Sequence, residues 1–453
     1  MKTTDLGKDS ILSIVLRLAI PSMLAQFVNV LYTIIDRMFI GNIPQIGEVA
    51  LAGIGVCGPI AAFLASFGNL VGIGGSVYMA MKMGAGENKK AEEILSNSFS
   101  LLIIMSLILT TVFLVFRKQM VVWFGASEET FAYASEYLAI YASGSVFAIV
   151  ALGMNYFITG QGFATIAMIS VVIGALANIV LDYLFVFVFD MQVAGAAWAT
   201  IISQFLSCLW TMLFLVGNRA RISLKKYKLC GNVIKKVITL GFPAFIMYAT
   251  DSVILIVLNV ILQYYGGAEM GDMLISAATI VQSYGLIVLC PLGGITAGTQ
   301  AVISYNYGAK NKQRVIKAFA YISTMAVIFC TIMFIISRFA PQYYVRLFTT
   351  DKNLAEMSVW GIKAYTLGLI PLALHYEATD GLTALGKAHI SVFMSAFRKG
   401  TFVALVCIIP MFLPPQYTFA AQSVGDGVCG IINTIICVFI LKKILNKMEI
   451  ENN

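Results

Sequence analysis

The sequence predicts an all-α polytopic membrane protein, with twelve transmembrane helices in two six-helix bundles related by a pseudo-twofold axis along the membrane normal. Three observations support this fold class. The chain is 59% hydrophobic and only 11% charged, apolar runs of about 20 residues or more recur along it, and its two halves resemble each other. A helix of that length crosses a hydrocarbon layer of about 30 Å. The runs are continuous rather than alternating, which argues against a β-barrel.

The apolar runs place the expected spans along the whole chain. They cover residues 11–40, 48–80, 94–116, 131–159, 163–189, 192–217, 236–264, 272–306, 315–340, 357–385, 389–413 and 417–441. The first run begins at Ile11 and continues past Pro21. It is too long for the apolar region of a signal peptide, so we expect no cleavable leader.

Lysine and arginine are distributed unevenly among the connections between spans. The chain has 30 basic and 22 acidic residues, a net charge of +8. Basic residues gather in alternate connections and in the tail, at Lys82, Lys89, Lys90, Arg219, Arg221, Lys225, Lys226, Lys228, Lys235, Lys236, Lys310, Lys312, Arg314, Lys317, Lys442, Lys443 and Lys447. The connections at 41–47, 190–191 and 265–271 have none. This pattern predicts that both termini and the basic loops are cytosolic, and it explains the net charge without a nucleic-acid partner.

The two halves match at a nearly fixed offset, which indicates an internal repeat. The matching pairs are Gly84 and Gly308, Phe124 and Phe348, Tyr141 and Tyr365, Gly144 and Gly368, and Gly162 and Gly386, all 224 residues apart, with Pro21 and Pro243 separated by 222. Each half has an even number of spans, so both enter the membrane in the same direction. Parallel repeats of this kind enclose a central cavity and alternate access. We expect an N-terminal lobe at 1–217, a basic cytosolic linker at 218–235 and a C-terminal lobe at 236–453.

Buried acids in the first half predict a cation-coupling site. Asp36 and Asp182 lie about 8 Å and 10 Å below the outer ends of the first and fifth spans, and Thr200 lies about 12 Å into the sixth. Asn178 is one turn below Asp182 on the same helix face. Two carboxylates that meet in a poorly hydrated site must share a proton or hold a cation. Asn178 and Thr200 would add the neutral oxygens that Na⁺ prefers, and Asp36 and Asp182 would be its metal ligands only if the ion is Na⁺.

The alternative is that each acid merely forms hydrogen bonds within the bundle. The internal repeat argues against it, because at the same offset Asn178 matches Phe402, Asp182 matches Val406 and Asp36 matches Leu258. A packing feature of the fold would be expected to recur in the second half. The absence of a copy favours a function performed once.

A second set of polar residues predicts the substrate cavity. Asp251 follows Tyr248 on the seventh span, and Glu377 and Asp380 lie on the tenth. These acids attract cationic substrates, carry protons or form a structural network, and the sequence leaves these alternatives open. The residues expected to line the cavity are Gln26, Asn29, Tyr32, Asn155, Asp251, Tyr248, Glu377 and Asp380.

The other charged and sulfur-containing residues have simpler interpretations. We expect Asp426 to pair with Arg398 in a structural role, and Arg37 either to reach the outer interface or to pair with a nearby acid. Of eight cysteines, Cys230 lies in a basic loop and the others in apolar spans without a C-x-x-C pair, so we expect all to be reduced. His375 and His389 lack metal-ligand spacing, and we expect no cofactor.

The chain resembles the multidrug and toxic compound extrusion (MATE) family, within its bacterial NorM-, DinF- and MepA-like branches. The resemblance covers nearly the whole chain and rests on the segments "LAIPSMLAQFVNVLYTIIDRMFIGN", "MGAGENKKAEEI", "NIVLDYLFVF", "VAGAAWATIISQ" and "YNYGAKNKQRVIKAF". "QAVISYNYGAKNKQRV" and "LTALGKAHISVF" are most similar to MepA-like members. The resemblance implies an antiporter of the bacterial plasma membrane that exchanges H⁺ or Na⁺ for cationic, often aromatic, amphiphiles.

The resemblance also implies which residues act. The acidic coupling site of the family matches Asp36, Asn178, Asp182 and Thr200, and Asp251 and Asp380 are plausible matches for acids in the second lobe. We therefore expect a monomeric, cation-coupled multidrug exporter, not an enzyme. The alternatives are a lipid-linked oligosaccharide flippase, which needs many intramembrane Arg and Lys residues, and an importer of a natural metabolite. A membrane enzyme is disfavoured because no nucleophile–base pair, metal triad or P-loop is visible.

Overall fold

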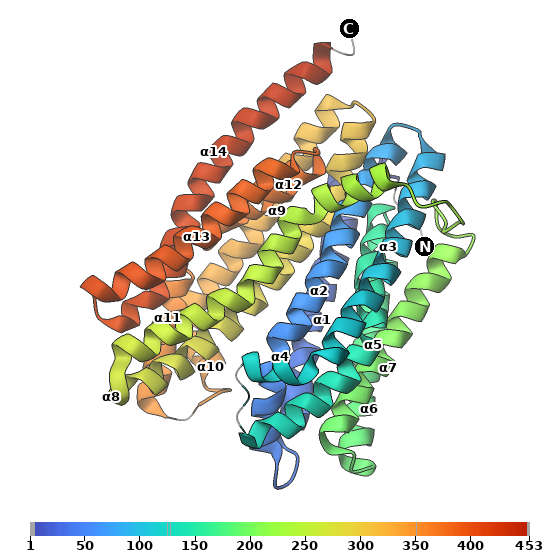
Figure 1. Cartoon of the computed structure of the whole chain (residues 1–453). Coiled ribbons are helices and arrows are strands. Elements are labelled where there is room, and N and C mark those ends of the chain that lie inside the picture. The colour runs from blue at the N-terminus through green and yellow to red at the C-terminus, as the bar shows by residue number, and fades with distance from the viewer. Residues whose placement is uncertain (1–4, 125, 127, 350, 451–453) are drawn as a thin grey trace.

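The computed structural model describes residues 5–124, 126, 128–349 and 351–450, apart from the side chains of residues 48, 251–253, 255, 256, 259, 268, 269, 272, 449 and 450. All regular secondary structure in this part of the chain is helical (Figure 1). The all-α fold class is therefore confirmed.

The first lobe contains the helices up to the linker. They are α1 (Ile11–Gly41), α2 (Gly47–Gly84), α3 (Asn88–Val115), α4 (Arg117–Trp123), α5 (Glu128–Gly160), α6 (Ala164–Asp182), the π-helical turn η1 (Tyr183–Val188) and α7 (Gln192–Val216). Helix α6 and η1 together form one span, Ala164–Val188. The linker then runs from residue 217 to 230.

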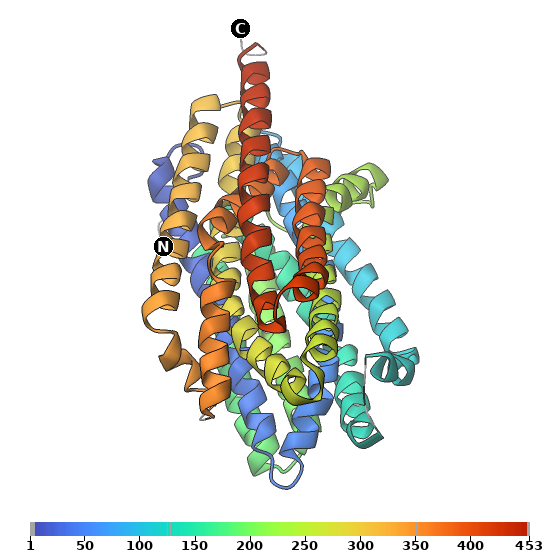
Figure 2. The same ribbon diagram turned by 90° about the vertical axis from the view of Figure 1, so that its left-hand side faces the viewer.

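The second lobe repeats this arrangement. Its elements are α8 (Gly231–Gly308), α9 (Lys312–Phe339), α10 (Pro341–Val345), α11 (Lys352–Tyr365), α12 (Leu369–Ala384), α13 (Ala388–Phe412), the 3₁₀ turn η2 (Pro415–Phe419) and α14 (Ala420–Ile450). Helix α8 is two spans that meet at Gly267, where φ is 63° and ψ is −163°. Only glycine adopts such a conformation without strain, so the chain turns there from the seventh span to the eighth. The last helix, α14, projects beyond its neighbours at the C-terminal end (Figure 2).

The number of spans agrees with the sequence-based prediction. In the described residues, 11 helices are long and apolar enough to cross a membrane, or up to 12 if α11 and α12 count as one broken span. These two helices meet at an angle of 50°, so the tenth span is not the continuous helix expected from the sequence. Large apolar side chains such as Leu107, Ile108, Ile435 and Phe439 are exposed on the outside of the bundle, as expected for a surface that faces lipid.

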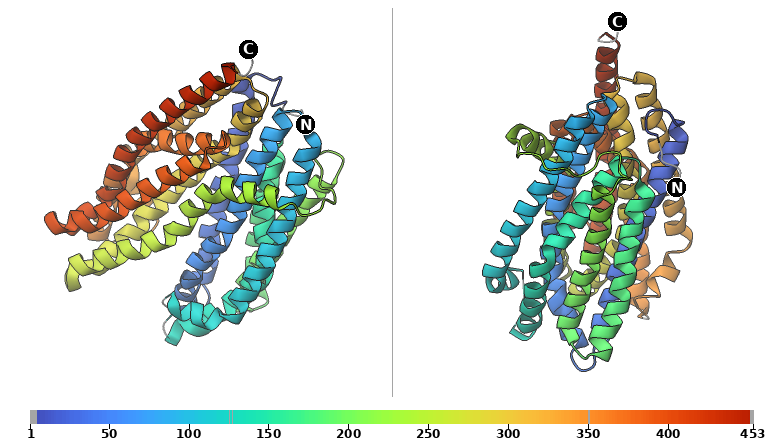
Figure 3. Two further views of the ribbon diagram at one scale, coloured as in Figure 1. Left: turned by 45° about the horizontal axis from the view of Figure 1, so that its top comes forward. Right: turned by 90° about the vertical axis from the view of Figure 1, so that its right-hand side faces the viewer.

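The two lobes meet at one end of the bundle. This end carries residues 5–10, the loops at 85–87 and 309–311, and the linker; we call it the linker face. The lobes diverge towards the opposite face, which carries the loop between α1 and α2 (Figures 1 and 3). The most extensive contacts between the lobes are those of α2 with α8 and of α1 with α8.

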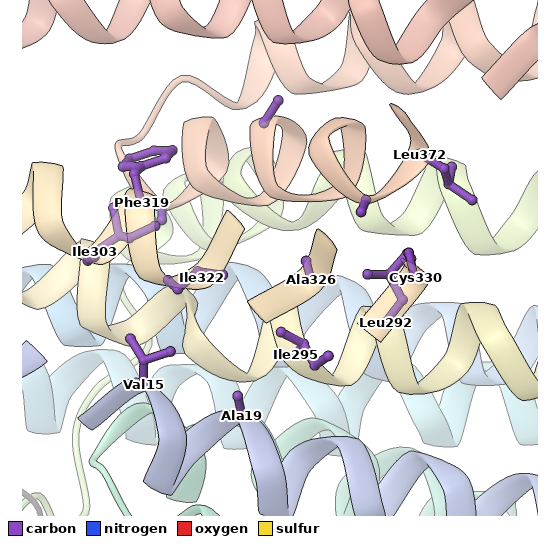
Figure 4. Packing of buried hydrophobic residues seen from close by; sticks show 14 of the residues in the cluster. Val15, Ala19, Leu292, Ile295, Ile303, Phe319, Ile322, Ala326, Cys330 and Leu372 are labelled. Atoms are coloured by element: carbon purple, nitrogen blue, oxygen red, sulfur yellow. The ribbon is translucent and has the colours of Figure 1, made fainter. Parts of the chain in front are cut away.

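The hydrophobic cores cross the boundary between the lobes. The core of the second lobe includes Ile14, Val15, Leu18 and Ala19 of α1, and Val15 and Ala19 lie opposite α8, which carries Ile295 (Figure 4). In the same way, the core of the first lobe includes Val233 and Val237 at the start of α8. Each lobe therefore places the beginning of its first helix against the other lobe.

Candidate functional site

Two carboxyl groups meet inside the first lobe. Asp36 lies on the last part of α1, and Asp182 is the final residue of α6 and is fully buried. Their side chains are close enough for a hydrogen bond. Because ionised carboxylates only accept hydrogen bonds, this contact becomes a hydrogen bond when one of the two acids holds a proton. The structure thus brings together the two acids that the sequence analysis singled out.

The backbone changes its geometry next to Asp182. Residues 183–188 form a π-helical turn in which the Phe189 N–H donates to the Leu184 carbonyl at 2.8 Å. Single π-helical turns occur frequently at functional sites because they interrupt the regular α-helical ladder. Here the turn places Asp182 at a junction between two helix types, a feature that the apolar sequence "YLFVFV" does not reveal.

Two tyrosines lie near the acid pair. Tyr32 of α1 lies within electrostatic range of both acids, and Tyr137 of α5 lies near Asp36. The side chain of Tyr137 forms a hydrogen bond with Thr200 of α7, so Thr200 is linked to the pair through this tyrosine. The ring of Tyr141 stacks on that of Tyr137 with centroids 6.0 Å apart, and its hydroxyl contacts Gln204.

The sequence did not predict Tyr137, Tyr141 and Gln204 as members of this group. One signal was available. Tyr137 and Tyr141 are four residues apart, as are Thr200 and Gln204, and such pairs lie on one face of a helix.

Several buried polar atoms of the site have no hydrogen-bond partner among the described residues. They are Asp36 Oδ1, both carboxylate oxygens of Asp182, and Oδ1 and Nδ2 of Asn178. Buried polar groups are normally paired, and unpaired ones mark strain or a bound species. The donor set of two carboxylates, an amide and nearby hydroxyls suits a proton or a small hard cation. Among the described residues, no group of three or more His, Cys, Asp or Glu could hold a metal ion.

A cavity of about 110 Å³ lies between the lobes, bounded by α1, α5, α6 and α8. Of the residues that the sequence predicts for a substrate cavity, Gln26, Asn29, Asn155 and Tyr248 line this cavity. The lining also includes Tyr156, whose hydroxyl donates to Asn69 Oδ1 at 3.0 Å. Among the side chains that the structure describes, which do not include that of Asp251, no Lys, Arg, Asp or Glu belongs to this lining.

Asn155 is oriented by its own hydrogen bond. Its Nδ2 donates to the Ala167 carbonyl at 3.2 Å, and its buried Oδ1 has no partner in the described part of the chain. The amide therefore presents a fixed acceptor at the cavity.

Three of the other predicted cavity residues, Tyr32, Glu377 and Asp380, are not part of this lining. Tyr32 lies beside the acid pair. Glu377 is only 2% exposed, with Oε1 unpaired among the described residues, and Asp380 contacts Thr296 and Gln300 of α8. Asp380 is within electrostatic range of Tyr156 and Tyr248, so it lies behind the cavity wall. Asp251 belongs to α8, but its side chain is outside the described residues.

The predicted pairing of Asp426 with Arg398 is confirmed. Arg398 Nε donates to Asp426 Oδ1 at 2.7 Å, and Gln422 Nε2 donates to the other oxygen at 2.8 Å. The Arg398 guanidinium also lies 5.7 Å from the centre of the Tyr376 ring. Arg37 is exposed and within electrostatic range of Asp36. All eight cysteines are free thiols.

Two bundles of membrane-spanning helices, a cavity between them and carboxylates buried at membrane depth define a polytopic membrane transporter. The MatE family model matches residues 21–184 and 243–409, once in each lobe. The chain therefore belongs to the MatE family.

Relatives and solved structures agree with this assignment. The chain is 27% identical over 440 residues to the multidrug export protein MepA of Staphylococcus aureus strain MSSA476, covering 96% of this chain and 95% of that protein. It is 26% identical over 447 residues to MepA of Staphylococcus haemolyticus, covering 98% and 96%.

The fold is also similar to that of solved transporters. An outward-facing multidrug resistance MATE transporter of the MOP superfamily superposes with a TM-score of 0.90 at 22% identity, covering 98% of this chain and 99% of that one. A MOP superfamily transporter from Pyrococcus furiosus gives the same values. At this level of identity the structural likeness concerns the fold.

Proposed function

We propose that this protein is a cation-coupled multidrug antiporter, which exports amphiphilic, mostly cationic organic compounds by alternating access. The observation that carries the proposal is the contact between Asp36 and Asp182 inside the first lobe. Carboxylates at this depth are costly and normally mark an ion or proton pathway.

The acid pair can act as an ion switch. When the site holds a proton or Na⁺, the repulsion between the two carboxylates is neutralised and α1 and α6 stay together. When the ion leaves, two negative charges face each other in a poorly hydrated site, and the helices are driven apart or rearranged. Binding of the ion thereby selects one arrangement of the first lobe.

The inter-lobe cavity suits an organic cation. Asn155 offers an unpaired carbonyl oxygen, Gln26 and Asn29 add amide groups, and the rings of Tyr156 and Tyr248 can bind a cation on their faces. Asp380 behind the two tyrosines adds a negative field. In the described part of the chain the lining has no Lys or Arg, which disfavours a flippase for pyrophosphate-linked oligosaccharides.

Ion site and cavity share two helices. Helix α1 carries Gln26 and Asn29 at the cavity and Asp36 at the ion site, and α6 carries Met168 and Val171 at the cavity and Asp182 at the ion site. A rearrangement of α1 and α6 on ion binding therefore changes the cavity as well. The coupling must be reciprocal, so a bound drug weakens ion binding by the same factor.

The distribution of basic residues orients the transporter. The linker face carries the basic loops, and cytoplasmic loops are enriched in Lys and Arg. We therefore assign the linker face to the cytosol of a bacterial plasma membrane, with both termini inside. In this orientation the lobes meet on the cytosolic side and diverge towards the exterior.

Transport by the purified protein tests this function. Proteoliposomes are loaded either with Na⁺ or with acidic buffer, the membrane potential is clamped, and uptake of an organic cation such as ethidium is followed by fluorescence. An antiporter accumulates the dye as the internal ion leaves, and an ionophore that collapses the gradient abolishes the accumulation. Dye uptake equal to that of protein-free liposomes under both gradients contradicts the proposal.

A further inference from the structure

We propose that two segments act as straps that hold the linker face closed. The N-terminal strap, residues 5–10, precedes α1 and binds to the second lobe; the linker strap, residues 222–230, precedes α8 and binds to the first lobe. Arg314 and Asn97 are the residues that hold them. The inference rests on the alternating access of the proposed function.

The N-terminal strap is fixed by Arg314 at the start of α9. One guanidinium nitrogen, Nη2, donates to the carbonyls of Leu6 and Asp9, both at 2.9 Å. Nε donates to Asn306 Oδ1 at 2.7 Å, and Asn306 Nδ2 donates to the Leu6 carbonyl at 3.3 Å. Leu6 is fully buried in the core of the second lobe. Hydrogen bonds from a charged donor are stronger than neutral ones, so Arg314 is the main anchor.

The N-terminal strap is also ordered internally. Asp5 Oδ1 accepts hydrogen bonds from the backbone N–H groups of Gly7 at 2.9 Å and Lys8 at 3.2 Å, and Asp9 Oδ2 accepts from the Asp5 N–H at 3.1 Å. The Gly7 hydrogen bond lowers the pKa of the Asp5 carboxyl. The strap is therefore a compact turn, and Arg314 binds two of its carbonyl groups.

The linker strap is fixed by Asn97 of α3. Asn97 Oδ1 accepts from the Cys230 N–H at 2.7 Å, and its Nδ2 donates to the Lys228 carbonyl at 3.3 Å. Asn97 is 1% exposed. Further along, the Lys225 ammonium lies 2.6 Å from a carboxylate oxygen of Glu92, and the Tyr227 hydroxyl donates to the other oxygen at 3.0 Å. These contacts pin the start of α8 to the first lobe.

The two straps occupy equivalent places in the internal repeat. Leu6 and Cys230 are 224 residues apart (230 − 6 = 224). The Leu6 carbonyl is the anchored group of one strap, and the Cys230 N–H is the anchored group of the other. The chemistry of the anchors differs, because Arg314 binds carbonyl oxygens and Asn97 binds both an N–H and a carbonyl. Each strap nevertheless fastens the beginning of one lobe to the other lobe.

The straps lie where the lobes touch most closely. A Cβ atom on Gly84 would collide with the Tyr305 carbonyl oxygen, and one on Gly308 would collide with that of Met81. The equivalent pairs are again 224 residues apart (308 − 84 and 305 − 81). Tyr305 packs against both hydrophobic cores, and its ring lies next to Gly7 of the N-terminal strap. Opening of the linker face must separate these backbones and release the straps.

Interactions present in only one of two states shift the equilibrium between them. Loss of the anchors should therefore favour the state in which the linker face is open. The test uses spin labels on Lys89 of α3 and Lys443 of α14, which are exposed and outside both straps, in the full chain with its eight native cysteines replaced. Pulsed electron spin resonance then measures the distribution of distances between the lobes, without a substrate or an ion gradient.

We expect a longer-distance population in Arg314→Gln and in Asn97→Ala, with the ratio of open to closed molecules rising about tenfold in each. The double variant should shift further. Arg314→Lys keeps the positive charge but loses the guanidinium that donates to two carbonyls, so it should give a smaller shift. It replaces Arg314→Gln in the test if that variant fails to fold. Lys317→Gln, an exposed position one turn along α9, is the control for charge removal and should match the parent.

An unchanged distance distribution in both Arg314→Lys and Asn97→Ala would overturn the proposal. Because the measurement needs no transport, it separates this inference from the proposed function. A protein that fails to move ethidium can still show the shift, and an active antiporter can fail to show it.

Discussion

The carboxyl group of Asp182 lies against that of Asp36, although the two residues are on different helices and are separated by 146 positions (182 − 36). Tyr32 lies within electrostatic range of both acids and Tyr137 within range of Asp36, while Asn178 precedes Asp182 by one helical turn with its amide unpaired among the described residues. The consequences of this site and of the packing between the lobes can be measured separately.

Tyr137 should set the affinity for the coupling ion. Tyr137→Phe removes the hydroxyl that links Thr200 to the neighbourhood of Asp36. The loss of one such hydrogen bond corresponds to about a 3- to 10-fold change in an equilibrium constant. We expect the ion concentration for half-maximal dye transport to rise by that factor. Tyr133→Phe, one turn earlier on α5, is the control, and equal behaviour of the two variants would argue against a role for Tyr137.

Asn155 should contribute to substrate binding. Asn155→Leu removes the fixed carbonyl acceptor at the cavity, so the KM for ethidium should rise about tenfold while the ion dependence stays unchanged. Thr159→Val is the matched control at another lining residue, because the Thr159 hydroxyl already donates to the Asn155 backbone carbonyl at 3.2 Å. A parental KM in Asn155→Leu would show that this amide does not contact the dye.

Gly84 should be intolerant of a side chain. In Gly84→Ala the new methyl group would collide with the Tyr305 carbonyl, and such overpacking costs about 1–3 kcal/mol. We expect a lower Tm and reduced transport. Gly55→Ala on the same helix has open space around the added carbon and should be at least as stable as the parent. Indistinguishable melting curves for the two variants would contradict the close approach of the lobes.

The pair of Arg398 and Asp426 should be structural. Breaking a buried ion pair costs about 3–5 kcal/mol because one charge is left without a partner. Asp426→Leu should therefore lower the Tm sharply, and the double variant Arg398→Met with Asp426→Leu should recover most of the loss. Thermal unfolding in detergent measures both. If the double variant is less stable than Asp426→Leu, the pair is not the stabilising unit inferred here.

The sequence predicts the fold well because apolar runs and basic loops directly reflect the bilayer. It also predicts the contact between Asp36 and Asp182, since acids at equal depth in neighbouring spans have few other partners. The pairing of Arg398 with Asp426 follows from the same reasoning.

Features that depend on packing were not predictable. The break between α11 and α12 precedes Pro371 in the first turn of α12, but the proline alone does not reveal that the span bends there by 50°. The polar contacts at this break come from α9. The Arg338 guanidinium lies 2.8 Å and the Ser337 hydroxyl 2.9 Å from the hydroxyl of Thr366, which follows α11. Tyr137 and Tyr141 resemble ordinary core residues in the sequence. Glu377 and Asp380 lie outside the cavity lining because α12 is packed behind α8, which depends on tertiary structure.

Ion-driven transport by acid-pair variants tests the central claim most directly. In proteoliposomes with an ion gradient, Asp36→Asn and Asp182→Asn should each reduce dye accumulation by at least about tenfold. Each variant replaces one carboxylate by an amide that does not ionise, so the charge repulsion within the pair no longer depends on the ion. Dye exchange without a gradient should persist. Asp190→Asn, at an exposed position beyond α6, should accumulate dye as the parent does. Gradient-driven accumulation at the parental rate in Asp36→Asn or Asp182→Asn would contradict the account.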